Sequence, residues 1–193
     1  LASPTLETAL TRALPTFRQR RAAGLDGIDF EGLRADLTAR KAANVARLPA
    51  LVEQFTASAT RNGAVVHHAR DAAEACAVVG RLAQERAARL IVKGKSMVTE
   101  EIGLNPYLEG LGLRVVETDL GEWIIQLAGE HPSHLLAPAL HKTREQIAEL
   151  LGRATGEPAD PDDIPALVKI ARRALRQSFI DADIGITGVN FAM

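Results

Sequence analysis

A cationic segment that also contains a serine, Lys93–Asn105, is the first stretch of this sequence whose residue types could do chemistry. It follows a short apolar run and begins Lys-Gly-Lys-Ser. Backbone amides at a helix start, with the ammonium groups of Lys93 and Lys95 and the hydroxyl of Ser96, could hold a carboxylate or a phosphate. The segment is not a P-loop, because the earlier glycine of that motif would fall at Arg89. The alternative is that both lysines are solvated loop charges.

The tripeptide Thr99-Glu100-Glu101 in the same segment allows two interpretations. Glu100 could face a cleft as a general base or as a covalent carboxylate. Alternatively, Thr99 caps a helix whose first turn contains the acids, which stabilises the helix and has no catalytic consequence. Glu100 is therefore the candidate catalytic residue, and Thr99 a candidate ligand-binding residue.

Polar residues also follow two later strand-like runs, Arg114–Glu117 and Ala182–Ile186. The candidate ligand-binding residues that share this position are Asp119, Glu122, Thr187, Gly188 and Asn190. Ligands of open parallel sheets bind beyond the carboxyl ends of strands, so we expect these residues at the same rim as Ser96. The alternatives are an N-cap role for Asp119 and a simple bend at Gly188.

The histidines and the single cysteine predict no metal site in this chain. His131, His134 and His141 are three and seven residues apart, and Pro132 breaks any helical face shared by the first two. A zinc site needs converging ligands at defined spacing, so we interpret them as ordinary loop histidines. Cys76, the one cysteine, excludes an internal disulfide framework and a Cys-rich cluster site. We expect no cofactor within these residues.

The elements that would position the candidate residues divide at residue 62. Residues 1–62 are predicted to form a helical arm of roughly two helices, separated at Gly24–Gly27, with Asp29 as N-cap of the second. From residue 63 short apolar runs alternate with capped helices. The predicted strands are Ala64–His67, Leu90–Val92, Arg114–Glu117, Leu135–Ala139 and Ala182–Ile186. This alternation predicts an α/β domain, with a mainly parallel sheet flanked by helices on both faces.

The composition limits the classes of binding partner that we expect. The chain is 47% hydrophobic and 24% charged with a net charge of −1, which is ordinary for a globular protein and favours neither nucleic acid nor anionic lipid. No apolar run approaches the roughly 20 residues of a membrane span, and no secretory signal is recognisable. We expect a cytoplasmic protein. We also expect the sheet to be incomplete at Met193, which leaves an edge that favours self-association into a homo-oligomer.

Three segments support a resemblance to a known family. They are KGKSMVTEEIGLN (Lys93–Asn105), ETDLGEWIIQLAGEHPSHLLAPALHK (Glu117–Lys142) and DADIGITGVNFAM (Asp181–Met193). Together they resemble the lactate-utilization domain, or LUD domain, of B- and C-type lactate-utilization proteins. The helical arm and the order of the motifs are closer to the B type. The resemblance covers essentially the whole chain and implies a fold similar to the sugar-isomerase and CoA-transferase-like α/β superfamily.

The resemblance also implies a function. B-type proteins continue past the position that matches Met193 into a ferredoxin-like region with two [4Fe–4S] clusters. With A- and C-type subunits they oxidise L-lactate to pyruvate and transfer electrons. This chain, which has no Cys-x-x-Cys run, would then be an N-terminal fragment of such an oxidoreductase subunit, inactive on its own. Two alternatives remain: a CoA-transferase-like or sugar-phosphate-handling enzyme domain, and a subunit-docking module without its own activity.

Overall fold

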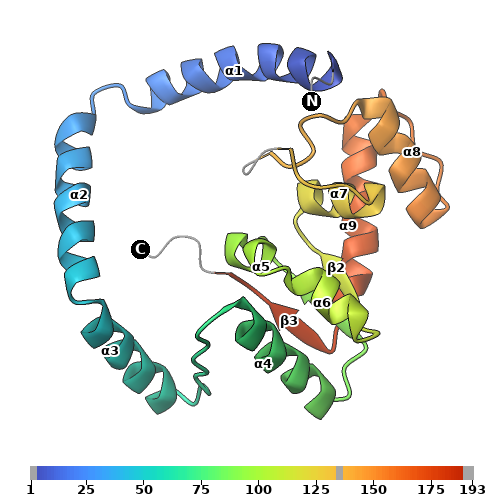
Figure 1. The fold of residues 1–193 in the computed structure, drawn as a ribbon. Helices are drawn as coiled ribbons and strands as arrows, with labels where there is room; N and C mark the ends of the chain where they lie inside the picture. The colour runs from blue at the N-terminus through green and yellow to red at the C-terminus, as the bar shows by residue number, and fades with distance from the viewer. Residues whose placement is uncertain (1–3, 134–136, 189–193) are drawn as a thin grey trace. The chain divides into compact units, whose positions relative to one another are not determined.

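The computed structural model describes residues 4–133 and 137–188 of the chain (Figure 1). The elements in chain order are α1 (Pro4–Gly24), α2 (Phe30–Ala46), α3 (Leu48–Arg61), α4 (Ala72–Glu85), β1 (Leu90–Lys93), α5 (Met97–Glu101), α6 (Leu104–Gly110), β2 (Arg114–Glu117), α7 (Leu120–Ala128), α8 (Arg144–Thr155), α9 (Ile164–Asp181) and β3 (Ile184–Ile186). The chain forms two compact units. One is Thr11–His68, and the other combines Leu1–Leu10 with Ala69–Met193. The predicted domain boundary at residue 62 stays a prediction.

Within the described residues, the sheet has three parallel strands in the order β2-β1-β3. Leu90 of β1 lies opposite Arg114 of β2, and Ile91 of β1 lies opposite Ile184 of β3. All four residues of β1 are buried, as expected for a central strand covered on both faces. The predicted α/β fold with a parallel sheet flanked by helices is confirmed.

Side chains of successive strand residues point to opposite faces of the sheet and build two separate cores. On one face Leu90, Val92 and Val116 pack against apolar residues of α7, α8 and α9, namely Trp123, Ala148, Leu151, Leu167, Ala171 and Leu175. On the other face Ile91 and Val115 pack against residues of α4 and α6, namely Cys76, Ala83, Leu104 and Leu108. The helices therefore fix the sheet from both sides (Figure 1).

Side-chain caps begin several of these helices where the sequence predicts them. Asp29 accepts a hydrogen bond from the backbone N–H of Gly32 at 2.9 Å. Thr143 and Gln146 form a complete capping box at the start of α8. Such caps stabilise a helix by about 0.5–2 kcal/mol each, since they satisfy amide groups that have no partner within the helix.

A side chain of α7 lies along the outer edge of β2. The Gln126 amide nitrogen donates to the carbonyl oxygen of Val115 at 2.8 Å, and the backbone N–H of Glu117 donates to the Gln126 amide oxygen at 3.0 Å. Gln126 thus bonds two backbone groups of β2 that a neighbouring strand would otherwise pair.

Three sequence-based expectations differ from the structure. The arm contains three helices, not two, because Pro49 cannot continue α2 and occupies the first turn of α3. Ala64–His67 forms no strand: among the described residues it has no partner strand, and Val65 is 79% exposed. Of the predicted strand Leu135–Ala139, residues 135 and 136 lie outside the described residues. Residues 137–139 lie in a turn region, in which Leu140 N–H donates to Ala137 O.

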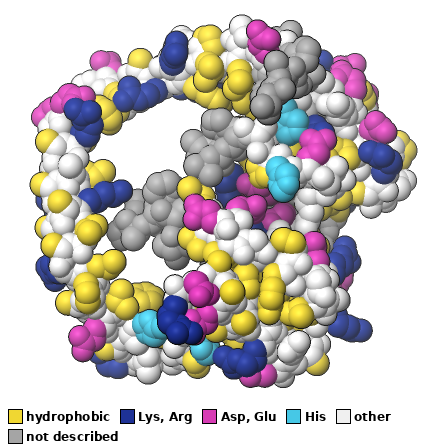
Figure 2. Space-filling view, viewed as in Figure 1, with side chains coloured by type: hydrophobic (Ala, Val, Ile, Leu, Met, Phe, Trp, Pro, Cys, Tyr) yellow, Lys and Arg dark blue, Asp and Glu magenta, His cyan; other side chains and the backbone are white. Residues whose placement is uncertain are grey.

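The arm helices α2 and α3 bury no side chain within the described part of the chain. Their exposed large apolar residues are Leu33, Leu37, Val45, Leu48, Val52 and Phe55. Figure 2 shows hydrophobic side chains at the surface of these helices. In the described residues, no helix has both the length and the apolar character needed to cross a membrane.

Candidate functional site

The ammonium group of Lys93, at the end of β1, is buried with three acceptors. The side chain is 1% exposed. Its Nζ lies 2.9 Å from Thr99 Oγ1, 3.0 Å from Glu100 Oε1 and 2.8 Å from Glu117 Oε1. An ammonium group has three N–H donors, so these acceptors satisfy all of them. Lys93 therefore connects the ends of β1 and β2 with α5, and in this arrangement it has no donor left for a ligand.

Glu117, at the end of β2, is the buried partner of Lys93. Burial raises the pKa of the Glu117 carboxyl above its ordinary value, while hydrogen bonds from Lys93 and Asn105 oppose that rise. The Asn105 amide nitrogen donates to Glu117 Oε1 at 2.6 Å. Among the described residues, the second carboxyl oxygen, Oε2, and the Asn105 amide oxygen have no hydrogen-bond partner. Protonation of Glu117 at Oε2 would turn that oxygen from an acceptor into a donor.

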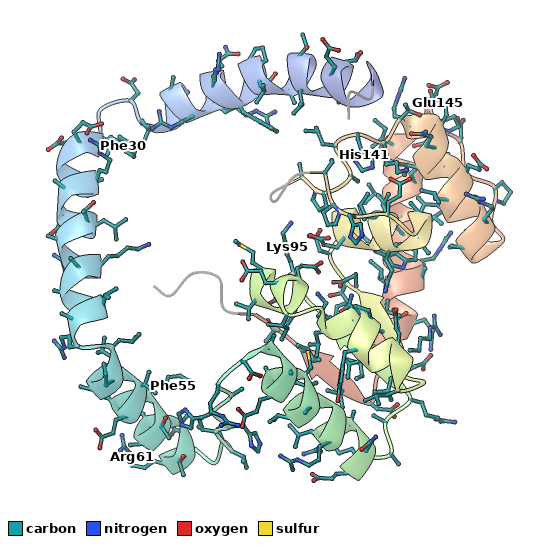
Figure 3. The ribbon with its side chains drawn as sticks, in the orientation of Figure 1. Phe30, Phe55, Arg61, Lys95, His141 and Glu145 are labelled. Carbon is teal, nitrogen blue, oxygen red and sulfur yellow. The ribbon has the colours of Figure 1, made fainter. Side chains whose placement is uncertain are left out.

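A second ion pair lies at the same rim of the sheet. Lys95, which precedes α5 (Figure 3), lies 3.1 Å from Glu122 of α7, and the Glu122 side chain is buried. A cavity of about 470 Å³ opens beside this pair. Its lining residues come from the segment at the start of α5, from α7 and from the segment after α7: Lys95, Ser96, Met97, Glu100, Glu101, Glu122, His131, Pro132 and Ser133. Among the described lining residues, three glutamates outnumber the one lysine, so this lining is acidic.

Ser96, which lines the cavity, is in close contact with Gly188. Ser96 is buried and caps α5, accepting from the Thr99 backbone N–H at 3.3 Å. A Cβ placed on Gly188 would lie 2.3 Å from Ser96 Oγ and 3.0 Å from Ser96 Cα. The Gly94 backbone N–H donates to Ile186 O at 2.8 Å, which holds the two segments together. Glycine at position 188 is required here by space.

Replacing Gly188 by alanine should therefore lower the free energy of unfolding by about 1–3 kcal/mol, the usual cost of inserting a methyl group into a packed site. Urea unfolding followed by circular dichroism measures the change. Gly110→Ala is the matched control, because nothing lies within 4 Å of the added Cβ there. Equal stabilities of the two variants would contradict the predicted clash.

The structure brings most of the predicted site residues together, and their function stays a prediction. Lys95, Ser96, Glu100 and Glu122 line the cavity, whereas Lys93 and Thr99 lie in the buried cluster beside it. A Cβ added to Gly94 would lie 3.8 Å from the Thr187 hydroxyl, so Thr187 lies close to Gly94, and Gly188 contacts Ser96.

Asp119 does not join this group. Asp119 forms the N-cap of α7, accepting from the backbone N–H groups of Gly121 and Glu122 at 3.1 and 3.3 Å. Asn190 lies outside the described residues.

Sequence reasoning missed Glu117 and Asn105 as members of the buried cluster. A signal for Glu117 exists, since each of the two strand-like runs, Leu-Ile-Val-Lys and Arg-Val-Val-Glu, ends in a charged residue. Lys93 and Glu117 are register partners in the parallel ladder. Opposite charges at matched strand ends are therefore recognisable once the two strands are assumed to be neighbours.

Comparison with known proteins identifies relatives over most of the chain. The family model of the LUD domain matches residues 52–193. Lactate utilization protein B of Geobacillus kaustophilus is 48% identical over 141 residues, which is 72% of this chain and 29% of that protein. The protein of the same name from Oceanobacillus iheyensis is 47% identical over 143 residues, 74% of this chain and 30% of that protein.

A third relative is an uncharacterized electron transport protein of Escherichia coli, 43% identical over 149 residues, 77% of this chain and 31% of that protein. The chain thus spans about three tenths of the length of these relatives. No solved structure matches. Because the family model covers more than half of its residues, the chain belongs to the LUD domain family.

Proposed function

We propose that this chain is the LUD region of a B-type lactate utilization protein, a cytoplasmic subunit that acts with A- and C-type subunits to oxidise L-lactate to pyruvate with electron transfer. The observation that supports this role is the 42–48% identity to proteins named lactate utilization protein B. The single buried thiol is typical of a protein in a reducing compartment.

The iron–sulfur part of this proposal concerns the longer protein. A [4Fe–4S] cluster is held by four cysteine thiolates, and this chain has one cysteine. Cys76 is buried, and its thiol donates to the carbonyl oxygen of Ile102. These residues do not fit a cluster, so we assign no electron-transfer step to them and propose that both clusters are bound outside residues 1–193.

A ligand for the cavity is a further part of the proposal. A small carboxylate such as lactate would place its charge against Lys95 and compete there with Glu122. Larger polyanions such as CoA or sugar phosphates are disfavoured, because three glutamates surround the same space. A monocarboxylate meets this repulsion once and a polyanion several times, so the lining disfavours the alternative of a CoA-transferase-like or sugar-phosphate enzyme.

Growth on L-lactate tests the function directly. Deleting the gene in its source organism should abolish growth on L-lactate and leave growth on pyruvate unchanged, because only the oxidation step is lost. The complete gene should restore growth, and its anaerobically purified product should contain cluster iron. Unchanged growth of the deletion strain on L-lactate would reject the function, and a product without iron would reject the cluster assignment.

The exposed apolar residues of α2 and α3 favour a second role for the arm, docking to the partner subunits. Co-purification of the longer protein with its A- and C-type partners tests this role. A variant with Leu37→Ser and Phe55→Ser should lose the partners, whereas Arg40→Ser on the same arm should retain them. Retention of the partners by the double variant would contradict docking through the arm.

A further inference from the structure

Four polar side chains between α7 and α8 form a hydrogen-bonded chain that the proposed function does not use. His141 Nδ1 lies 2.7 Å from Ser133 Oγ, and His141 Nε2 lies 2.7 Å from Glu130 Oε2. The other oxygen of Glu130 accepts from Lys142 Nζ. A hydroxyl, an imidazole and a carboxylate in this order, each within hydrogen-bond distance of the next, is the arrangement of an activated nucleophile with its base and the group that orients the base.

The two neighbours of the His141 ring define which tautomer its neutral form would adopt. Hydrogen bonds from Lys142 and from His141 lower the pKa of the Glu130 carboxyl, so it stays ionised and can only accept. In neutral imidazole one nitrogen carries the proton, and the carboxylate selects Nε2 for it. Nδ1 is then a lone-pair acceptor directed at the Ser133 hydroxyl. In this tautomer, Nδ1 could accept a proton from Ser133.

Ser133 has a second acceptor within reach, the carbonyl oxygen of Pro138 at 3.1 Å. The distance to His141 Nδ1 is shorter by 0.4 Å, from the difference between 3.1 and 2.7 Å. The Ser133 hydroxyl thus has two possible acceptors, and His141 Nδ1 is the nearer of them.

Ser133 also has access to a ligand. It lines the same cavity of about 470 Å³ as Lys95 and Ser96, whereas the His141 side chain behind it is only 19% exposed. The cavity is large enough for a small organic molecule and is acidic. Lys95 is the lysine among the described lining residues and lies beside Glu122, so the simplest substrate for Ser133 is small and uncharged.

We propose that Ser133 is a nucleophile for acyl transfer from small neutral esters, with His141 as its general base and Glu130 as the positioning residue. Ser133 Oγ attacks the ester carbonyl carbon while its proton passes to His141 Nδ1. The carbon–oxygen bond to the alcohol then breaks, and the alcohol leaves with that proton. Water attacks the acyl-serine with His141 again taking a proton, which releases the acid and restores the hydroxyl. This activity is independent of the role in lactate oxidation.

A neutral organophosphorus ester tests the nucleophile, because it phosphorylates activated serines and leaves ordinary ones unmodified. The 193-residue chain is treated with diisopropyl fluorophosphate, and the modified residue is located by peptide mass spectrometry. Ser133 should be labelled, Ser133→Ala should not react, and Ser178→Ala, a control on α9, should react as the unchanged chain does.

Variants of His141 and Glu130 test whether the reactivity of Ser133 depends on these two side chains. His141→Gln should reduce the labelling rate of Ser133 by about 10²–10⁴-fold, the usual contribution of a general base. Glu130→Gln should change the pH profile of labelling, since an amide no longer selects the Nε2–H tautomer. Circular dichroism checks that each variant is folded. Absence of label at Ser133, or a folded His141→Gln variant that reacts as fast as the unchanged chain, would overturn the proposal.

Discussion

Replacing Lys93 by methionine is expected to lower the free energy of unfolding by about 3–5 kcal/mol. The substitution keeps most of the side-chain volume and removes the ammonium group that neutralises Glu117, whose side chain is 4% exposed. The carboxyl would remain buried beside Glu100 with no cation within reach of its Oε1. Urea unfolding at pH 7, followed by circular dichroism and tryptophan fluorescence, measures the loss.

Two further variants test whether the loss of stability comes from breaking the ion pair between Lys93 and Glu117. Lys93→Met combined with Glu117→Leu removes both charges and should recover much of the stability, because well-packed apolar residues often replace a buried ion pair without cost. Arg81→Met disrupts the exposed pair with Glu85 and should change stability by no more than about 1 kcal/mol. A loss in Lys93→Met no larger than in Arg81→Met would show that the buried cluster does not contribute to stability.

Replacing Glu117 by glutamine should change how stability depends on pH. Burial raises the pKa of Glu117 above its ordinary 4.5, so the folded chain binds this proton more tightly than the unfolded chain does. The stability that the group contributes is complete below pH 4.5 and is lost as pH rises through the raised pKa. The stability of the unchanged chain relative to Glu117→Gln should therefore fall as pH rises above 4.5. Urea unfolding of both proteins across a pH series measures this difference.

Glu130→Gln is a control for which the stability difference should change with pH in the opposite direction. Hydrogen bonds from Lys142 and His141 lower the pKa of Glu130, so its contribution is present above pH 4.5 and is lost as pH falls through the lowered pKa. The stability of the unchanged chain relative to this variant should therefore rise with pH. If the two differences changed with pH in the same direction, the assignment of a raised pKa to Glu117 would be wrong.

Much of the fold follows from patterns that are local in the sequence. Leu90–Val92 and Arg114–Glu117 are short apolar runs between capped helices, and both became strands because a helix covers each of their faces. Ala64–His67 has the same local pattern and formed no strand. Strand formation requires a neighbour to complete the hydrogen bonds, and a local pattern does not report whether a neighbour is present.

The site was less predictable, because its geometry depends on contacts between distant segments. Lys93 and Lys95 look equivalent in the sequence, yet one is buried with three acceptors and the other lines a cavity. Alternation along an extended chain explains this difference, since residues two apart share a face only while the strand continues, and β1 ends at Lys93. The chain of Glu130, Ser133 and His141 joins residues up to 11 positions apart in an irregular segment, where no periodicity reveals which side chains meet.

The side chain of Gln126 covers one edge of this sheet, the outer edge of β2. Its amide occupies the backbone donor of Glu117 and the carbonyl oxygen of Val115, so an incoming peptide would first have to displace a well-placed side chain at that margin. A side chain that covers the edge of β2 in this way hinders edge-to-edge pairing with another molecule at that edge.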